Sequence, residues 1–154
     1  MFWLFLLASL SFAGISGYSH AQDILGVDDA NRAKINYMLN CQGCHGPDGD
    51  GTSDGSVPQM KNLVGNFLLA EGGREFLVQV PGSANAALNN DHLAEVLNWM
   101  LYTQSKKQLP KLFQPYSARE VGKLRANPIV DVIGTRAALL KKLPKPLQQS
   151  MATH

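Results

Sequence analysis

The stretch "NCQGCHGPDGDG", Asn40–Gly51, contains the only two cysteines of this 154-residue chain. Cys41 and Cys44 are separated by two residues, and His45 follows directly. The Gly, Pro and Asp residues after the histidine predict a loop. The preceding residues, "DDANRAKINYMLN" (28–40), predict a helix with an aspartate N-cap. We therefore expect two thiols and one imidazole at the point where a helix gives way to a loop.

Several kinds of site contain two cysteines at this spacing. A structural zinc site needs four nitrogen or sulfur ligands, and Cys41, Cys44, His45 and His92 are conceivable, although adjacent residues do not easily ligate one tetrahedral ion. A thioredoxin-like redox pair should follow a strand, and no strand pattern precedes Cys41. A disulfide across two residues would be strained. The "DGDGTSDG" run lacks the glycine and glutamate spacing of a calcium loop.

C-x-x-C-H is the attachment signature of haem c. Two thiols add to the two vinyl groups of the porphyrin, and the next residue then faces the iron as its proximal ligand. The sequence therefore predicts one covalent haem c, held by Cys41 and Cys44 and coordinated by His45. The zinc site and the redox pair remain as alternatives.

The N-terminal residues predict export. "FWLFLLASLSFAGI" (2–15) is apolar but short for a bilayer span. It leads into "SGYSHA", with the small residues Ser19 and Ala21 where a signal peptidase reads. No Lys or Arg precedes the apolar run, so an uncleaved membrane anchor is the alternative. We expect a signal peptide over residues 1–21 and a periplasmic protein in an oxidising compartment.

The remaining sequence predicts an all-α protein, because no convincing period-2 strand pattern occurs. "NNDHLAEVLNWMLYTQS" (89–105) is the clearest helix, capped by Asn89 or Asn90. Short helices are expected on either side of Gly72 and Gly73. The long helix carries one apolar stripe at helical spacing, namely Leu93, Val96, Leu97, Met100 and Leu101.

The chain after residue 104 is expected to be an extension of two helices. Ser117 can cap a short helix through Ala126, and a second helix runs from about Ile129 to Leu143, before Pro144 and Pro146. We therefore divide the chain into a signal peptide (1–21), a helical domain (22–104) and a basic helical C-terminal extension (105–154).

Charge is distributed unevenly along the chain. Residues 1–105 contain 4 basic and 10 acidic residues, whereas residues 106–154 contain 10 basic and 2 acidic residues. This asymmetry concerns partners or internal docking rather than fold. The basic face of the extension either wraps around the acidic domain or docks to a partner protein or an anionic membrane surface.

From about Ala30 to Tyr102 the chain resembles the class I c-type cytochromes, which are exported monohaem proteins. The resemblance rests on "YMLNCQGCHGPDGDG" (37–51), which is similar to the family's haem-binding segment. Pro58 in "VPQM" resembles a family proline whose carbonyl accepts a hydrogen bond from the proximal histidine. That bond would orient His45. Met60 stands where the family usually has leucine.

Helix packing adds to the resemblance. The 89–102 helix is similar to the family's C-terminal helix. Trp99 stands at the position of an aromatic residue that crosses the N-terminal helix, close to Ala33 and Tyr37.

The sequence departs from this family at the distal iron ligand. The family usually supplies a methionine from a Met-Pro pair before the last helix, and Val80-Pro81 stands there instead. The distal ligand is therefore unknown, with Met60 as a weak candidate. The other possibilities are an open or water-bound iron and these side chains: Met38, Met100, His92, Asn85, and Met151 or His154 if the tail folds back.

The resemblance implies a carrier of single electrons rather than an enzyme. The expected partners are redox proteins such as a periplasmic dehydrogenase or a terminal acceptor, and no nucleic acid is expected. Arg74 is a candidate partner for a haem propionate. An open distal site would instead make the protein a small-ligand binder or sensor. "VPGSANAALNN" (80–90) offers no acid–base group of the kind that peroxidase chemistry requires.

Overall fold

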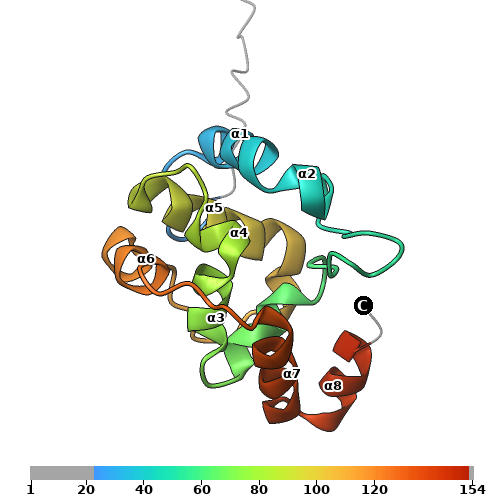
Figure 1. Cartoon of the computed structure of the whole chain (residues 1–154). Coiled ribbons are helices and arrows are strands. Elements are labelled where there is room, and N and C mark those ends of the chain that lie inside the picture. Colours follow the sequence, from blue (N-terminus) through green and yellow to red (C-terminus); the bar gives the residue numbers. More distant parts are fainter. Residues whose placement is uncertain (1–22, 153–154) are drawn as a thin grey trace, which may run out of the picture.

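The computed structural model describes residues 23–152, so the predicted signal peptide and His154 lie outside the described residues. This part of the chain contains helices and no strand, which confirms the all-α prediction (Figure 1). The helices are α1 (Ala30–Asn40), α2 (Gln42–His45), the 3-10 helix η1 (Val64–Leu69), α3 (Gly73–Gln79), α4 (Pro81–Ala84), α5 (Asn90–Ser105), the 3-10 helix η2 (Lys106–Gln108), α6 (Ala118–Arg125), α7 (Val132–Lys142) and α8 (Lys145–Ala152).

Helices α1 and α5 form the central pair and begin at predicted caps. The Asp29 carboxylate accepts hydrogen bonds from the first turn of α1, and the Asn89 side chain accepts one from the His92 N–H. Ala33 is fully buried at the contact with α5, where a small side chain allows two helices to approach closely. The rings of Tyr37 and Trp99 pack beside it, with centroids 5.4 Å apart.

The predicted apolar stripe of α5 lies in the core. All five of its members are buried, and η1, α3 and the extension pack around them. Within residues 23–152, none of the helices has both the length and the apolar character needed to cross a bilayer.

The extension contains three α-helices, so the prediction of two is wrong. Ser117 caps α6 as expected, and Asp131 caps α7. The chain then forms α8 directly after Pro144, with Pro146 inside its first turn. A proline stops a helix only in its interior, because the first-turn N–H groups have no intrahelical partner to lose. The two prolines therefore separate α7 from α8 without ending helical structure.

The extension shares the core of the preceding helices instead of forming a second unit. α6 packs on α3, α4 and α5, while α7 and α8 lie together at one end of the molecule (Figure 1). Six apolar side chains of residues 106–152 belong to the same buried cluster as the α5 stripe, namely Tyr116, Val121, Leu139, Leu140, Leu143 and Met151.

Candidate haem site

The C-x-x-C-H motif forms a single helical turn at the end of α1. The N–H groups of Cys44 and His45 both donate to the Cys41 carbonyl, at 3.2 and 3.0 Å. This turn places two free thiols and one imidazole within five residues. Cys44 is exposed, whereas Cys41 is half-buried. Burial, with a smaller effect of the Cys44 charge, raises the pKa of the Cys41 thiol to about 11.

The loop after His45 folds back under the histidine. The Gly51 N–H donates to the His45 carbonyl at 3.0 Å, and the Met60 N–H donates to the Gly49 carbonyl at 2.7 Å. Gly51 has a φ of 71°, and a Cβ there would collide with the Val57 carbonyl oxygen and the main chain of Pro58. The glycine therefore allows the 46–60 loop to close tightly and brings Pro58 to the imidazole.

One ring nitrogen of His45 lacks a partner. Its Nδ1 atom is buried and makes no hydrogen bond. Burial lowers the pKa of His45, and the Pro58 backbone carbonyl acts in the opposite direction. The carbonyl is therefore close enough to act on the ring although the bond is not well formed. A histidine that turns Nδ1 to a carbonyl leaves Nε2 to bind a metal.

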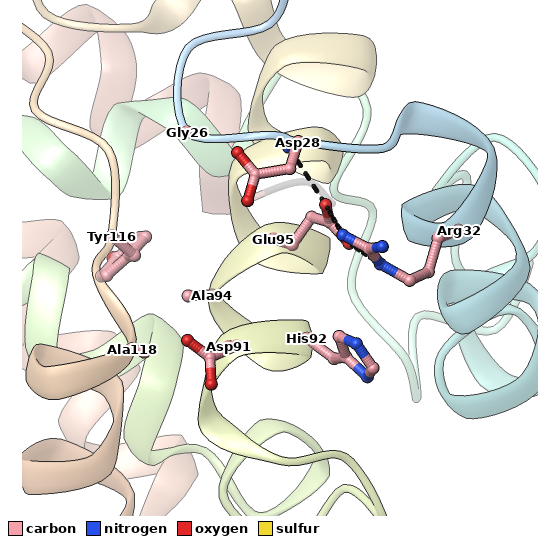
Figure 2. A pocket seen from close by; sticks show the side chains of 9 residues that line it. All are labelled: Gly26, Asp28, Arg32, Asp91, His92, Ala94, Glu95, Tyr116 and Ala118. Atoms are coloured by element: carbon pink, nitrogen blue, oxygen red, sulfur yellow. Dashed lines mark hydrogen bonds and ion pairs between the residues drawn. The ribbon is translucent and has the colours of Figure 1, made fainter.

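A separate polar pocket lies between the first turns of α1 and α5 (Figure 2). Its centre is the buried Glu95 carboxylate, which accepts bonds from the N–H groups of Asp28 and Asp29 at 3.1 and 2.9 Å. Glu95 also receives two bonds from the Arg32 guanidinium. Burial alone would raise the pKa of Glu95, but the hydrogen bonds and the charge of Arg32 outweigh burial and lower it. His92 lines this pocket and not the turn that contains the cysteines.

The alternative interpretations of the motif find no support in the described residues. Between residues 23 and 152, no three His, Cys, Asp or Glu side chains are grouped so that they could hold a metal ion. A zinc site built from the motif and His92 is therefore not present. No strand precedes Cys41, so the strand-to-helix junction of a thioredoxin-like pair is missing from this part of the chain.

Comparison with known proteins agrees with the motif. A cytochrome c-552 of Thermus thermophilus is 33% identical over 121 residues, covering 67% of this chain and 80% of that protein. The chain belongs to the c-type cytochromes. Another Thermus thermophilus cytochrome c-552 is 34% identical over 116 residues, covering 64% of this chain and 86% of its own length. No protein-family model matches the sequence. No solved structure matches it either.

Haem c is accordingly the covalent cofactor of this cytochrome, and the motif turn fits it. Both thiols are free, Cys44 is open to solvent, and the Nδ1 atom of His45 is buried without a hydrogen-bond partner. Cys41 and Cys44 would hold the haem through two thioether bonds, and His45 would supply one ligand to its iron.

The candidate distal residues of the cytochrome are scattered. Val80 follows α3 directly and is half-buried, and Asn85 ends α4. Met100 is buried within the α5 stripe, whereas Met38 is half exposed on α1. The tail does fold back, and Met151 on α8 is only 1% exposed. The burial of Met151 was not expected from the sequence, because it depends on helix α8, which the sequence did not predict.

Arg74, the candidate partner for a haem propionate, is engaged by the extension. Its guanidinium pairs with Glu120 on α6, and Nη2 lies 2.8 Å from the Glu120 Oε2 atom. The same guanidinium donates to the Gln114 and Pro115 carbonyls and lies 4.1 Å from the centre of the Tyr116 ring. All of these partners are residues of the extension.

Proposed function

We propose that this cytochrome carries single electrons between redox proteins in the periplasm. In this proposal Cys41 and Cys44 attach the only haem, and His45 is the proximal iron ligand. The observation that carries the proposal is the motif turn itself, where two free thiols and the imidazole lie on one turn and the Pro58 carbonyl acts on that imidazole.

The protein's contribution to electron transfer is to hold the cofactor without rearrangement. Haem iron supplies the one-electron chemistry, with a potential that depends on its axial ligands and surroundings. The two thioether bonds fix the porphyrin to α2. The Pro58 carbonyl holds the imidazole orientation and increases its basicity. The exposed Cys44 marks the edge of the site at which we expect exchange with partners.

The position of Met60 favours its interpretation as a packing residue. The Pro58 carbonyl acts on the His45 imidazole, and a histidine that turns Nδ1 to a carbonyl binds a metal through Nε2. Met60 follows two residues later, and its N–H is tied to Gly49 in the same loop. In this proposal the loop that contains Met60 lies on the proximal side of His45, and a distal ligand would approach from the other side.

A specific observation keeps small-ligand binding as the second candidate function. Residues 80–90 replace the family's ligand-bearing loop with small or neutral side chains, and the segment contains no Met, His or charged residue. An iron without a strong sixth ligand binds CO or NO. Such a protein would act as a haem-based sensor.

The basic face of the extension supports docking to an acidic redox partner such as a dehydrogenase. Among residues 23–152, the one ion pair that joins the extension to the preceding domain is Arg74–Glu120, in which the extension supplies the acid. The lysines of the extension are exposed, namely Lys106, Lys107, Lys111, Lys123, Lys141, Lys142 and Lys145. The extension therefore wraps the domain without pairing its lysines with acidic side chains there, and their positive charge remains available to steer association.

Two measurements test this function. A pyridine haemochrome assay on protein made with a haem maturation system should show one covalent haem c per chain, and its absence would refute the assignment. Carbon monoxide then separates the two candidates. A reduced protein that binds CO slowly or not at all is a carrier, whereas rapid CO binding replaces the carrier with a ligand-binding function.

A further inference from the structure

We propose that Arg125, on the last turn of α6, is the residue that positions the distal wall of the haem site. The segment Ala84–Asn90 follows Val80-Pro81, which stands where the family usually has its Met-Pro pair, and in this proposal it forms part of the distal wall. In this proposal the C-terminal extension holds the segment in place and so controls access to the sixth iron position. This inference rests on the haem site proposed above.

The Arg125 guanidinium donates hydrogen bonds to three carbonyls of this segment. Arg125 donates from Nε and Nη2 to the Ala84 carbonyl at 3.0 and 2.9 Å. Its Nη2 also reaches the Ala86 carbonyl at 2.7 Å, and its Nη1 reaches the Leu88 carbonyl at 2.7 Å. Charge-assisted bonds of this length are among the stronger hydrogen bonds in proteins. Together they hold every second residue of the segment against α6.

The segment has little structure of its own to do the same. α4 has four residues and ends at Ala84, and the N–H groups of Asn85 and Ala86 make only short-range bonds to Pro81 and Ser83. No further helix begins until Asn90. Without Arg125, the carbonyls of Ala84, Ala86 and Leu88 would lose the only partners that they have from other segments within residues 23–152.

A second contact ties the extension to the start of the distal region. The Ile129 N–H, beyond the end of α6, donates to the Gln79 carbonyl at 2.9 Å, directly before Val80. α6 also packs closely on the start of α5, since a Cβ on Gly122 would lie 2.6 Å from the Asn90 Nδ2 atom. The extension therefore fixes both ends of residues 79–90, while Arg125 fixes their middle.

Arginine is needed here for its shape as well as its charge. A planar guanidinium offers five N–H donors in a fixed fork, whereas a lysine ammonium is a single point with three donors. Lysine could therefore bind one or two of the carbonyls but could not span all three. This difference allows a positioning role to be separated from a simple charge effect.

The test compares Arg125→Gln and Arg125→Lys with the wild type, all purified as covalent haem proteins. Lys123→Gln is the matched control, because Lys123 is an exposed cation of the same helix. The CO association rate of the reduced form and the reduction potential are measured beside the free energy of unfolding. We expect Arg125→Gln to change the CO rate about fivefold or more. Arg125→Lys should fall between it and the wild type, and the control should match the wild type.

The outcomes separate this inference from the proposed function. Arg125 has no positioning role if the Gln variant keeps the wild-type CO rate and potential within about twofold, even where it unfolds more easily. If the Gln variant cannot be purified folded, the Lys variant decides by the same criterion, because it keeps the charge and most of the stem. A wild type without covalent haem would refute the proposed function and not the contacts of Arg125.

Discussion

The proximal and distal sides of the candidate haem site are built in opposite ways. The proximal side uses one continuous stretch, in which Tyr37 donates to the Gly46 carbonyl and the 46–60 loop returns to His45. The proposed distal side brings together residues 79–90 and an extension that follows only after the whole length of α5. A cofactor motif can be recognised where its contacts are local. A wall assembled from distant segments cannot be recognised in that way.

The two sides also differ in what holds them. On the proximal side we expect covalent bonds to the cofactor, so the chain needs only a turn and a loop. On the proposed distal side the chain holds itself, through Arg125 and through the bond from Ile129 to Gln79. Substitutions of the haem-attaching cysteines on the first side should therefore change cofactor content. Those on the second should change stability or ligand access.

The largest expected effect of a substitution is the loss of covalent haem on the proximal side. Replacing both Cys41 and Cys44 with serine should abolish covalent haem, because neither thioether bond can then form. The measurement is the pyridine haemochrome absorbance that remains with the protein after extraction of free haem. Gly43→Ala is a suitable control within the same turn, since a Cβ there meets nothing within 4 Å. Covalent haem in the double variant would show that the motif is not the attachment site.

The next largest expected effect is a loss of stability at the junction of the extension with α5. Asn98 is fully buried, donates to the Gly26 and Tyr116 carbonyls at 2.9 and 3.0 Å, and accepts from the Tyr116 N–H at 2.7 Å. Asn98→Ala leaves the buried main-chain groups of Tyr116 without partners, which should lower the free energy of unfolding by roughly 3 kcal/mol.

Urea unfolding of the haem-loaded protein measures this loss. Thr103→Ala, an exposed position on the same helix, should cost less than about 0.5 kcal/mol. A cost for Asn98→Ala as small as that of Thr103→Ala would show that α5 and the extension do not depend on this side chain. Covalent haem content should stay unchanged in both variants.

The sequence was sufficient for the elements whose signals are local. Asp29, Asn89 and Ser117 cap the helices that they were expected to cap, since an N-cap is decided within three residues. The α5 stripe was predicted because its members repeat at helical spacing, and all of them are buried. The loop after His45 was indicated by its Gly, Pro and Asp content.

Contacts between distant segments could not be predicted. In the sequence, nothing near Arg74 or Arg125 indicates that Glu120 or the carbonyls of residues 84–88 are their partners. The third helix of the extension was missed because Pro144 and Pro146 were interpreted as an end, although proline is equally suited to a first turn. The partners of Arg74 and the third helix both lie in the extension, where the structure depends on packing instead of local signals.

A smaller effect should appear in the pH dependence of the Arg74–Glu120 pair. The hydrogen bond from Arg74 holds the pKa of Glu120 below its usual value. A carboxyl with a lowered folded-state pKa stabilises the fold above its unfolded pKa, and this stabilisation is lost as the pH falls through the folded-state pKa. Glu120→Gln should therefore cost about 1 kcal/mol near pH 7, and the difference from wild type should shrink below about pH 4.

The measurement for this pair is the free energy of unfolding as a function of pH. Glu71→Gln is the control, because Glu71 is an exposed carboxylate that forms no ion pair within the described part of the chain. A constant difference between Glu120→Gln and wild type from about pH 7 to about pH 3 would contradict the ion pair as the source of the stabilisation.

The smallest effect returns to the proximal side, at Pro58. The group that acts on His45 is the Pro58 main-chain carbonyl, which every amino acid possesses. Pro58→Ala should therefore keep both the covalent haem and its absorption spectrum. The free energy of unfolding should fall by about 0.4–1 kcal/mol, because alanine gives the unfolded chain more freedom. A loss of haem, or a changed haem spectrum at unchanged haem content, would show that the proline ring itself positions His45. The proximal side would then depend on side-chain packing, as the distal side does.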